Sequence, residues 1–174
     1  MRKLVVFLLL PAFTILIAKP VAPWKLHLRG FGPVTIGMTM SDVERASGMK
    51  VTSSNFVARE CAIYEFKAIP NFQMMFTNWS PPGEPTLARI YIQNPNILTL
   101  SGIHPGSTIA DVRNAYAGYL RDGHNAYTSQ PEFVFIPKGK IDEAFRIIFV
   151  TDGKVVTEIS IGKLPEMDLI EGCI

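Results

Sequence analysis

The side chains that could hold a metal ion in this 174-residue chain are two cysteines, three histidines and an acidic group near the C-terminus. They are Cys61, Cys173, His27, His104, His124, Glu166, Asp168 and Glu171. The cysteines and histidines are scattered and lack the close ligand spacing of a zinc site. The acidic group lacks the regular spacing of a calcium-binding loop. We therefore expect neither a metal nor another cofactor.

The chain also lacks the patterns that place a nucleophile or an acid–base pair. It contains no Gly-x-Ser-x-Gly elbow, no His-Glu-x-x-His helix and no Gly-rich phosphate loop. His104 precedes a Pro-Gly turn and His124 lies in a polar stretch, so neither histidine is paired with a nucleophile in the sequence. We expect that the protein is not an enzyme; a hydrolase of unknown substrate is the least favoured function.

The N-terminus predicts export. Arg2 and Lys3 form a short positive region, and the apolar run 4–18 is shorter than the roughly 20 residues that a membrane-spanning helix needs. This arrangement is typical of a secretory signal peptide over residues 1–18, with cleavage after Ala22 as the alternative. An uncleaved N-terminal anchor is the competing interpretation. No cysteine lies near the cleavage region, which argues against a lipoprotein anchor.

Removal of this segment would change the net charge of the protein. The full chain has 17 Lys and Arg residues and 15 Asp and Glu residues, and two of the basic residues belong to the signal. The mature chain would therefore be neutral, without the basic field that nucleic-acid binding needs. We expect no nucleic-acid partner and no membrane span after signal removal.

Export also predicts the state of the two cysteines. An even pair in an oxidising compartment favours a disulfide, here between Cys61 and Cys173. The alternative is two free thiols. The bridge would tie the C-terminus back onto the first half of the chain, and closing so long a loop stabilises a fold by up to roughly 4–5 kcal/mol in the chain-entropy model.

A ten-residue pattern occurs twice, with five identical positions at an offset of 69 residues. The shared residues are Gly37, Thr39, Asp42, Val43 and Ala46 in the first copy, and Gly106, Thr108, Asp111, Val112 and Ala115 in the second. Thr followed three residues later by Asp is the pattern of a helix capping box, and Gly permits a sharp turn before it. The pattern predicts a helix after each threonine, the first ending at Gly48.

Strands are expected after each helix, because β-branched and aromatic residues alternate there with polar ones. They cover 61–68, 72–76 and 88–92 in the first half, and 133–136, 145–150 and 155–161 in the second. The expected fold class is α+β, with two tandem repeats, each a helical segment packed on a small antiparallel β-sheet. The expected segments are a signal peptide (1–18), an N-terminal lead-in (19–31), repeat 1 (32–93), a linker (94–101), repeat 2 (102–162) and a disulfide-tied C-terminal tail (163–174).

Two features of this arrangement are candidates for contacting a partner. A Pro-rich loop, 77–87, occurs only in the first repeat and carries Trp79, either as an exposed anchor or folded back over the sheet. The second feature is the sheet face opposite the helices, which is either an exposed binding surface or buried between the repeats. By alternation that face carries Ile63, Glu65, Gln73, Met75, Arg89, Tyr91, Arg146, Ile148, Glu158 and Ser160. The candidate partner-binding residues are Trp79, Met75, Arg89, Tyr91 and Arg146.

The tandem pattern resembles the β-lactamase-inhibitor-protein fold, and the small outer-membrane-assembly lipoproteins of the SmpA/OmlA type use a single related unit. The resemblance rests on the Gly-x-Thr-x-x-Asp-Val motif at both helix starts and covers most of residues 32–162. It implies a concave sheet surface that grips a protein partner. We therefore expect an exported, periplasmic or secreted, non-enzymatic protein-binding module. The alternative is a scaffold for envelope assembly or stability.

Overall fold

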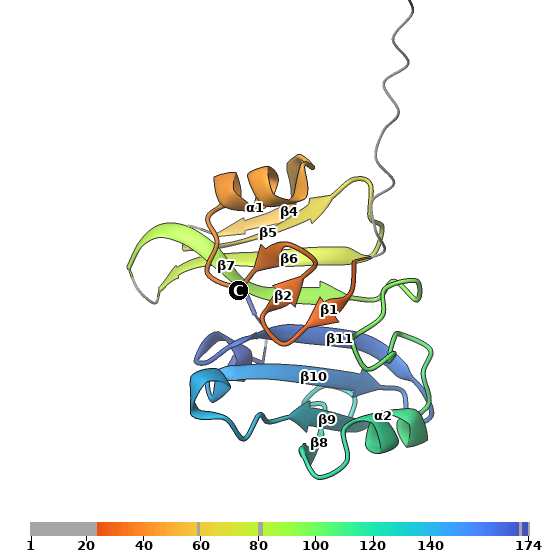
Figure 1. Ribbon diagram of the computed structural model, residues 1–174. Helices are drawn as coiled ribbons and strands as arrows, with labels where there is room; N and C mark the ends of the chain where they lie inside the picture. The colour runs from red at the N-terminus through yellow and green to blue at the C-terminus, as the bar shows by residue number, and fades with distance from the viewer. Residues whose placement is uncertain (1–23, 59, 80–81, 171, 174) are drawn as a thin grey trace, which may run out of the picture.

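The computed structural model describes residues 24–58, 60–79, 82–170 and 172–173 (Figure 1). The predicted signal peptide, the start of the lead-in and Glu171 lie outside these residues. No helix in the described part is long and apolar enough to cross a membrane.

The described residues form two antiparallel sheets and a few short helical segments. The small sheet contains β1 (Leu26–His27), β2 (Gly30–Phe31) and β3 (Val34–Thr35). The large sheet has eight strands in the order β4-β5-β6-β7-β11-β10-β9-β8. Its strands are β4 (Val51–Ala58), β5 (Cys61–Phe66), β6 (Phe72–Trp79), β7 (Pro82–Ile92), β8 (Leu120–His124), β9 (Pro131–Phe135), β10 (Phe145–Thr151) and β11 (Val156–Lys163). The helical segments are α1 (Met40–Ser47), α2 (Ile109–Ala115), η1 (Lys140–Asp142) and η2 (Glu166–Asp168).

The predicted α+β fold with two tandem repeats, each a helical segment on its own small sheet, is wrong. The protein is mostly β, because β7 and β11 pair directly and join all eight strands into one sheet. The helices have only eight and seven residues, so each is about 12 Å long or less and is too short to cover a sheet of its own. Pairing β7 with β11 also removes two exposed sheet edges, whose unpaired amide and carbonyl groups invite aggregation.

All six predicted strands are present, and the prediction missed five others. The missed strands are β4, β8 and the three strands of the small sheet. The prediction of a loop over residues 77–87 is also wrong, because β6 and β7 extend through most of this range as a hairpin. Glycine and charged residues make β8 a poor strand by composition, and its pairing with β9 creates it.

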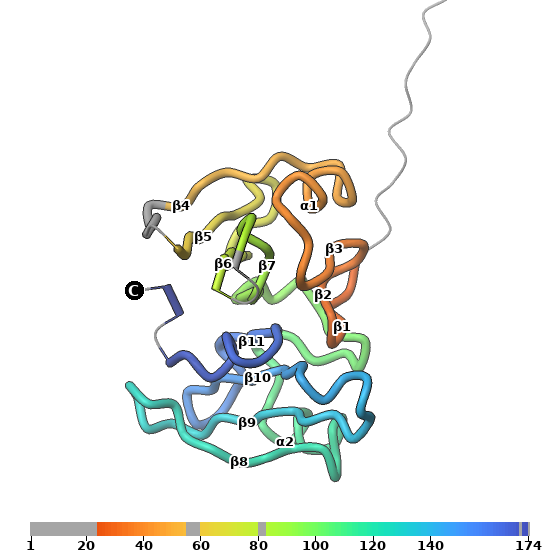
Figure 2. Tube along the Cα trace, turned by 90° about the vertical axis from the view of Figure 1, so that its left-hand side faces the viewer, coloured from red at the N-terminus to blue at the C-terminus, as the bar shows by residue number. Residues whose placement is uncertain are grey.

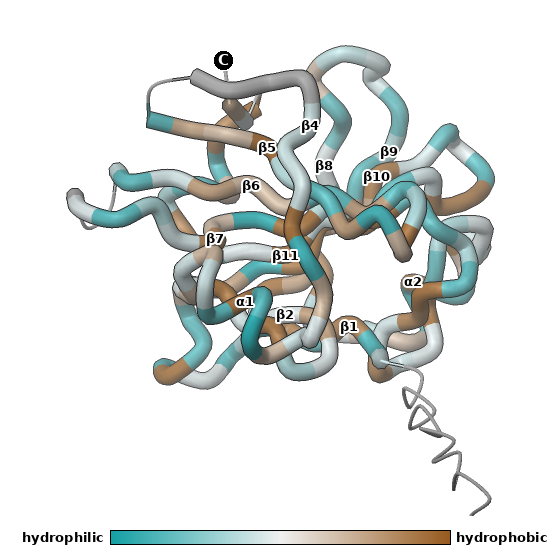
Figure 3. Tube along the Cα trace, turned by 90° about the horizontal axis from the view of Figure 1, so that it is seen from above, coloured by the Kyte–Doolittle hydropathy of each residue, from teal (hydrophilic) through white to brown (hydrophobic). Residues whose placement is uncertain are grey.

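One face of the large sheet carries the main hydrophobic core. Every second residue of the central strands points to this face, and the small sheet, α1 and α2 cover it (Figure 3). The helices contribute Val43 and Val112, which are both fully buried. Phe31 of the small sheet packs on Phe72 of the large one, with ring centroids 5.0 Å apart.

Both copies of the repeated pattern form capping boxes, as predicted. The Thr39 hydroxyl accepts a hydrogen bond from the Asp42 amide at 3.2 Å, and the equivalent bond from Asp111 to Thr108 measures 3.1 Å. In both copies the aspartate side chain accepts a bond from the threonine amide. The first helix ends at Gly48, which has the left-handed conformation (φ 68°). The second helix ends at Ala115, with Tyr116 as its C-cap.

Replacing Thr39 or Thr108 by alanine is expected to lower the free energy of unfolding by about 1 kcal/mol each. In both copies the threonine hydroxyl also donates a hydrogen bond to the aspartate carboxylate, which lowers the pKa of Asp42 and of Asp111. A lowered folded-state pKa stabilises the fold above the ordinary aspartate pKa, and this contribution is lost as the pH falls through the lowered value. Urea titrations between about pH 3 and about pH 7 should therefore show that the free energy of unfolding falls less steeply with decreasing pH in the alanine variants. Serine at either position should behave as wild type.

Candidate functional site

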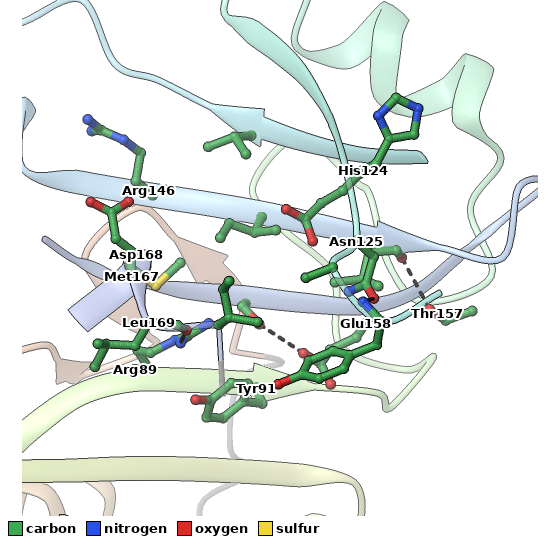
Figure 4. A pocket seen from close by; sticks show the side chains of 18 of the residues that line it. Arg89, Tyr91, His124, Asn125, Arg146, Thr157, Glu158, Met167, Asp168 and Leu169 are labelled. Atoms are coloured by element: carbon green, nitrogen blue, oxygen red, sulfur yellow. Dashed lines mark hydrogen bonds between the residues drawn. The ribbon is translucent and has the colours of Figure 1, made fainter. Parts of the chain in front are cut away.

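The face of the large sheet opposite the core carries a groove of about 550 Å³. Its floor consists of strands β7, β11, β10, β9 and β8. Its sides are the C-terminal segment (residues 164–170 and 172–173) and the loop after β8 (residues 125–130) (Figures 2 and 4). The lining residues with charged or aromatic side chains are Arg89, Tyr91, Arg121, His124, Tyr127, Glu132, Arg146, Glu158 and Asp168. The groove is therefore polar and contains both signs of charge.

The strand register arranges the floor in three rows that run across the strands. One row is acidic, because Glu158 lies opposite Val150, which lies opposite Glu132. Another row is basic, because Gly162 lies between Arg89 and Arg146. In Figure 4, Arg89 and Arg146 lie toward one end of the groove and Glu158 toward the other.

The row between them is mostly uncharged. It runs through Tyr91, Ser160, Ile148, Val134 and Arg121, each opposite the next. Arg121, on the outer strand, is the charged member of this row. The floor therefore changes from acidic through mainly apolar to basic along the strand direction.

The charges on the floor are not neutralised by ion pairs within the described residues. The four ion pairs found there join Arg29 to Asp142, Arg45 to Asp42, Lys50 to Glu44 and Arg113 to Asp122, all away from the groove. Glu158 accepts hydrogen bonds from Gln93 and Ser160, both neutral donors. Arg146 donates to the backbone carbonyls of Glu143 and Phe145. Charges of both signs thus keep capacity for an outside partner.

Arg89 links the groove to the C-terminal segment. Its side chain is 6% exposed and donates to the carbonyl oxygens of Leu169 (2.8 Å) and Glu166 (3.3 Å). Its guanidinium lies over the Tyr91 ring, 4.9 Å from the centroid. Burial raises the pKa of Tyr91, so this phenol stays neutral and donates to the Met75 sulfur. A buried arginine with two carbonyl partners holds the segment against the sheet.

Two further contacts fix the C-terminal segment on the sheet. Met167 is buried against Gly162, where a Cβ atom would come within 2.7 Å of the Met167 sulfur. Beyond it, the predicted Cys61–Cys173 disulfide is present, with the two Cα atoms 5.4 Å apart. The segment thus covers parts of β5, β6, β7 and β11 on this face, and β8, β9 and β10 remain open beside it. Where this face is buried, the C-terminal segment covers it and not a second repeat.

Three of the five candidate partner-binding residues line the groove, namely Arg89, Tyr91 and Arg146. Met75 is fully buried beneath Tyr91 and the C-terminal segment, so a partner that leaves the fold unchanged does not touch it. Trp79 ends β6 and packs, half-buried, on the cluster of Cys61, Met75 and Ala88. The structure therefore separates Trp79 from the groove.

Sequence reasoning missed Glu132, Arg121 and Tyr127. Glu132 follows the first residue of β9, and alternation with the buried Phe133 would have placed it on the open face. Arg121 belongs to β8, which was not predicted. Tyr127 belongs to a loop, for which periodicity carries no information about direction.

Burial raises the pKa of the half-buried Glu132 above its ordinary value of 4.5, despite opposing effects of Asn125, Arg89 and Arg121. The folded protein thus holds this proton more tightly than the unfolded chain, so ionisation costs stability as the pH rises through the interval between the two pKa values. We expect Glu132→Gln to remove this loss and make the protein more stable at neutral pH. Urea titrations of both proteins across that interval provide the measurement.

The exposed Glu143→Gln is the control for this prediction, and it should leave the pH dependence unchanged. Parallel stability curves for wild type and Glu132→Gln would contradict the cost assigned to Glu132.

The described residues contain no group of three or more His, Cys, Asp or Glu side chains that could hold a metal ion.

Comparison with protein-family models, with curated proteins and with solved structures finds no match. The resemblance to β-lactamase-inhibitor proteins thus stays a prediction from the repeated sequence pattern.

Proposed function

We propose that this chain is an exported, non-enzymatic module that binds a protein partner in the groove of the large sheet. The observation that carries the proposal is the groove itself, whose floor presents Glu132, Glu158 and Arg146 without ion-pair partners among the described residues. Keeping half-buried charges unpaired costs stability, and a partner that pairs with them offsets that cost.

The composition of the groove fits a protein interface better than a small-molecule pocket. Two exposed apolar side chains line it, Tyr127 (64% exposed) from the loop after β8 and Ile170 (67% exposed) from the C-terminal segment. Arginine and tyrosine, which are enriched at protein interfaces, contribute Arg146 and Tyr91 to the floor. Small-molecule pockets are usually more enclosed and more apolar.

The groove is also held in shape before a partner arrives. Its floor is a continuous hydrogen-bonded sheet, and Arg89, Met167 and the disulfide fix one side. A preformed surface loses less conformational entropy on binding than a mobile one does. This supports recognition of a partner without rearrangement of the floor.

The disulfide supports the exported location. Disulfides persist in the periplasm and outside the cell but are rare in the reducing cytosol. Together with the predicted signal peptide, the Cys61–Cys173 bridge supports an encounter with the partner in an oxidising compartment. A scaffold in the cell envelope is a special case, in which the bound protein is membrane-associated.

Site-specific photocrosslinking tests the proposal in the exporting cell. A benzophenone amino acid at Tyr127 or Ile170 should give a discrete adduct with another protein, and Arg146→Glu in the same chain should remove it. The matched control is the same group at Ile141, which is 85% exposed and does not line the groove. Adducts that are equal at Ile141, or that persist with Arg146→Glu, would rule out the groove as the binding site. Recovery in the envelope fraction would favour the scaffold role.

A further inference from the structure

We infer that the groove recognises an extended peptide segment of the partner in which a basic and an acidic side chain are four residues apart, with an apolar side chain midway. This inference rests on the proposed function and specifies its partner. It follows from the spacing of the charged rows, because the acidic and basic rows cross β10 at Val150 and Arg146.

The acidic and basic rows are separated by four residues along β10, which is also the spacing between side chains i and i+4 of an extended peptide. Four residues of a strand span about 13 Å at about 3.3 Å per residue. A segment lying along β10 has the same rise, so its side chains i, i+2 and i+4 all point toward the floor. Its charged side chains then meet Glu158 and Glu132 at one end and Arg146 at the other.

The middle row suits the side chain at i+2. The half-buried Ile148 presents aliphatic surface in this row, with the more deeply buried Val134 opposite it and the Tyr91 ring on the far side of Ser160. A branched aliphatic residue such as valine fits this position. Tyr127 and Ile170, on the loop and the C-terminal segment, supply apolar contacts beside the segment.

Two groove charges, those of Asp168 and Arg121, oppose this simple pattern. Asp168 lines the basic end and is exposed, as Figure 4 shows beside Arg146. His124 and Arg121 are exposed members of the β8 side. Because the basic end contains this competing carboxylate, Asp168→Asn should strengthen binding of the acidic side chain, which gives a variant that gains affinity.

Blocked pentapeptides test the spacing on the disulfide-bonded full chain. The probes are acetyl-Lys-Thr-Val-Thr-Asp-amide, its reverse order acetyl-Asp-Thr-Val-Thr-Lys-amide, and the isomer acetyl-Lys-Asp-Val-Thr-Thr-amide, whose charges are adjacent. One of the first two should bind about tenfold more tightly than the isomer, since it forms two partly exposed ion pairs at once. NMR amide shifts should locate it over β10 and β11. Glu158→Gln and Arg146→Gln should each weaken that peptide toward the isomer.

A charge swap gives the sharper test. Arg146→Glu together with Glu158→Lys and Glu132→Gln reverses the polarity of the floor, because both carboxylates of the acidic row are then removed, so the preferred order of the two charged peptides should reverse as well. The inference is overturned if the isomer binds as well as the spaced peptides, or if the swap leaves the preferred order unchanged. Self-association of the chain that Arg146→Glu abolishes would assign the groove to a second copy and also overturn it.

The two proposals fail separately. If groove crosslinks to a protein persist but the spaced peptides do not outcompete the isomer, the partner-binding function stands and the charge spacing is wrong. If the groove yields no crosslink, the proposed function itself is wrong, whatever the peptides do.

Discussion

Replacing Cys61 and Cys173 by alanine should lower the free energy of unfolding by about 4 kcal/mol. The two cysteines are 112 positions apart, so the bridge removes much of the conformational freedom of the unfolded chain. Its loss also frees the end of the C-terminal segment, because Arg89 and Met167 hold only residues up to about Leu169. Urea denaturation of the oxidised wild type and of the double variant gives the measurement.

Reduction is the matched control for this prediction. Reductant should destabilise the wild type by about the same amount and leave the double variant unchanged, since the variant has no cysteine. Limited proteolysis should then cut the C-terminal segment of the variant first, while the sheet stays intact. Equal unfolding midpoints for oxidised wild type and variant would contradict a stabilising role of the bridge.

Phe72→Ala should cost about 3–5 kcal/mol of folding free energy. The Phe72 side chain is 1% exposed, and its ring lies 5.0 Å from that of Phe31 and 5.5 Å from that of Phe66. Truncation therefore leaves a cavity where the small sheet meets the large one. Because Phe72 belongs to β6 and faces away from the groove, a folded variant should keep the binding properties of the groove.

The controls for Phe72 separate the cavity from other effects. Phe72→Leu retains most of the volume and should cost much less, and Ile141→Ala, at an exposed site, should change stability by less than about 0.5 kcal/mol. Urea denaturation of the three variants decides the matter. A loss below about 1 kcal/mol for Phe72→Ala would mean that the surrounding core closes around the site.

Local features of the structure were predictable from the sequence. The capping boxes at Thr39 and Thr108 depend on side chains three residues apart, and the six predicted strands depend on alternation within single short segments of the chain. The disulfide was predictable because the chain has only two cysteines. The open face was predictable in part, since alternation correctly placed Arg89, Tyr91, Arg146 and Glu158 on one side of the strands.

The failures came from interactions between distant segments. The tandem pattern suggested two sheets, but Ile92 pairs with Ile159 and makes one sheet of both halves. Strand β8 has little β propensity and exists because its backbone pairs with β9. Trp79 was expected on a loop, either as an exposed anchor or folded back over the sheet, and only the hairpin of β6 and β7 decides this by carrying it onto the buried cluster around Cys61.

The sequence by itself determined where α1 and α2 begin, the positions of six strands, which side of those strands is apolar and which cysteines pair. Only the tertiary structure decided that the strands form one sheet, and that the C-terminal segment and the loop after β8 enclose a groove with acidic and basic ends. The physical reason is the distance along the chain between the residues that interact. Caps and alternation are set by neighbours along the chain, whereas the groove depends on the register of β7, β11, β10 and β9, which hydrogen bonds between remote residues establish.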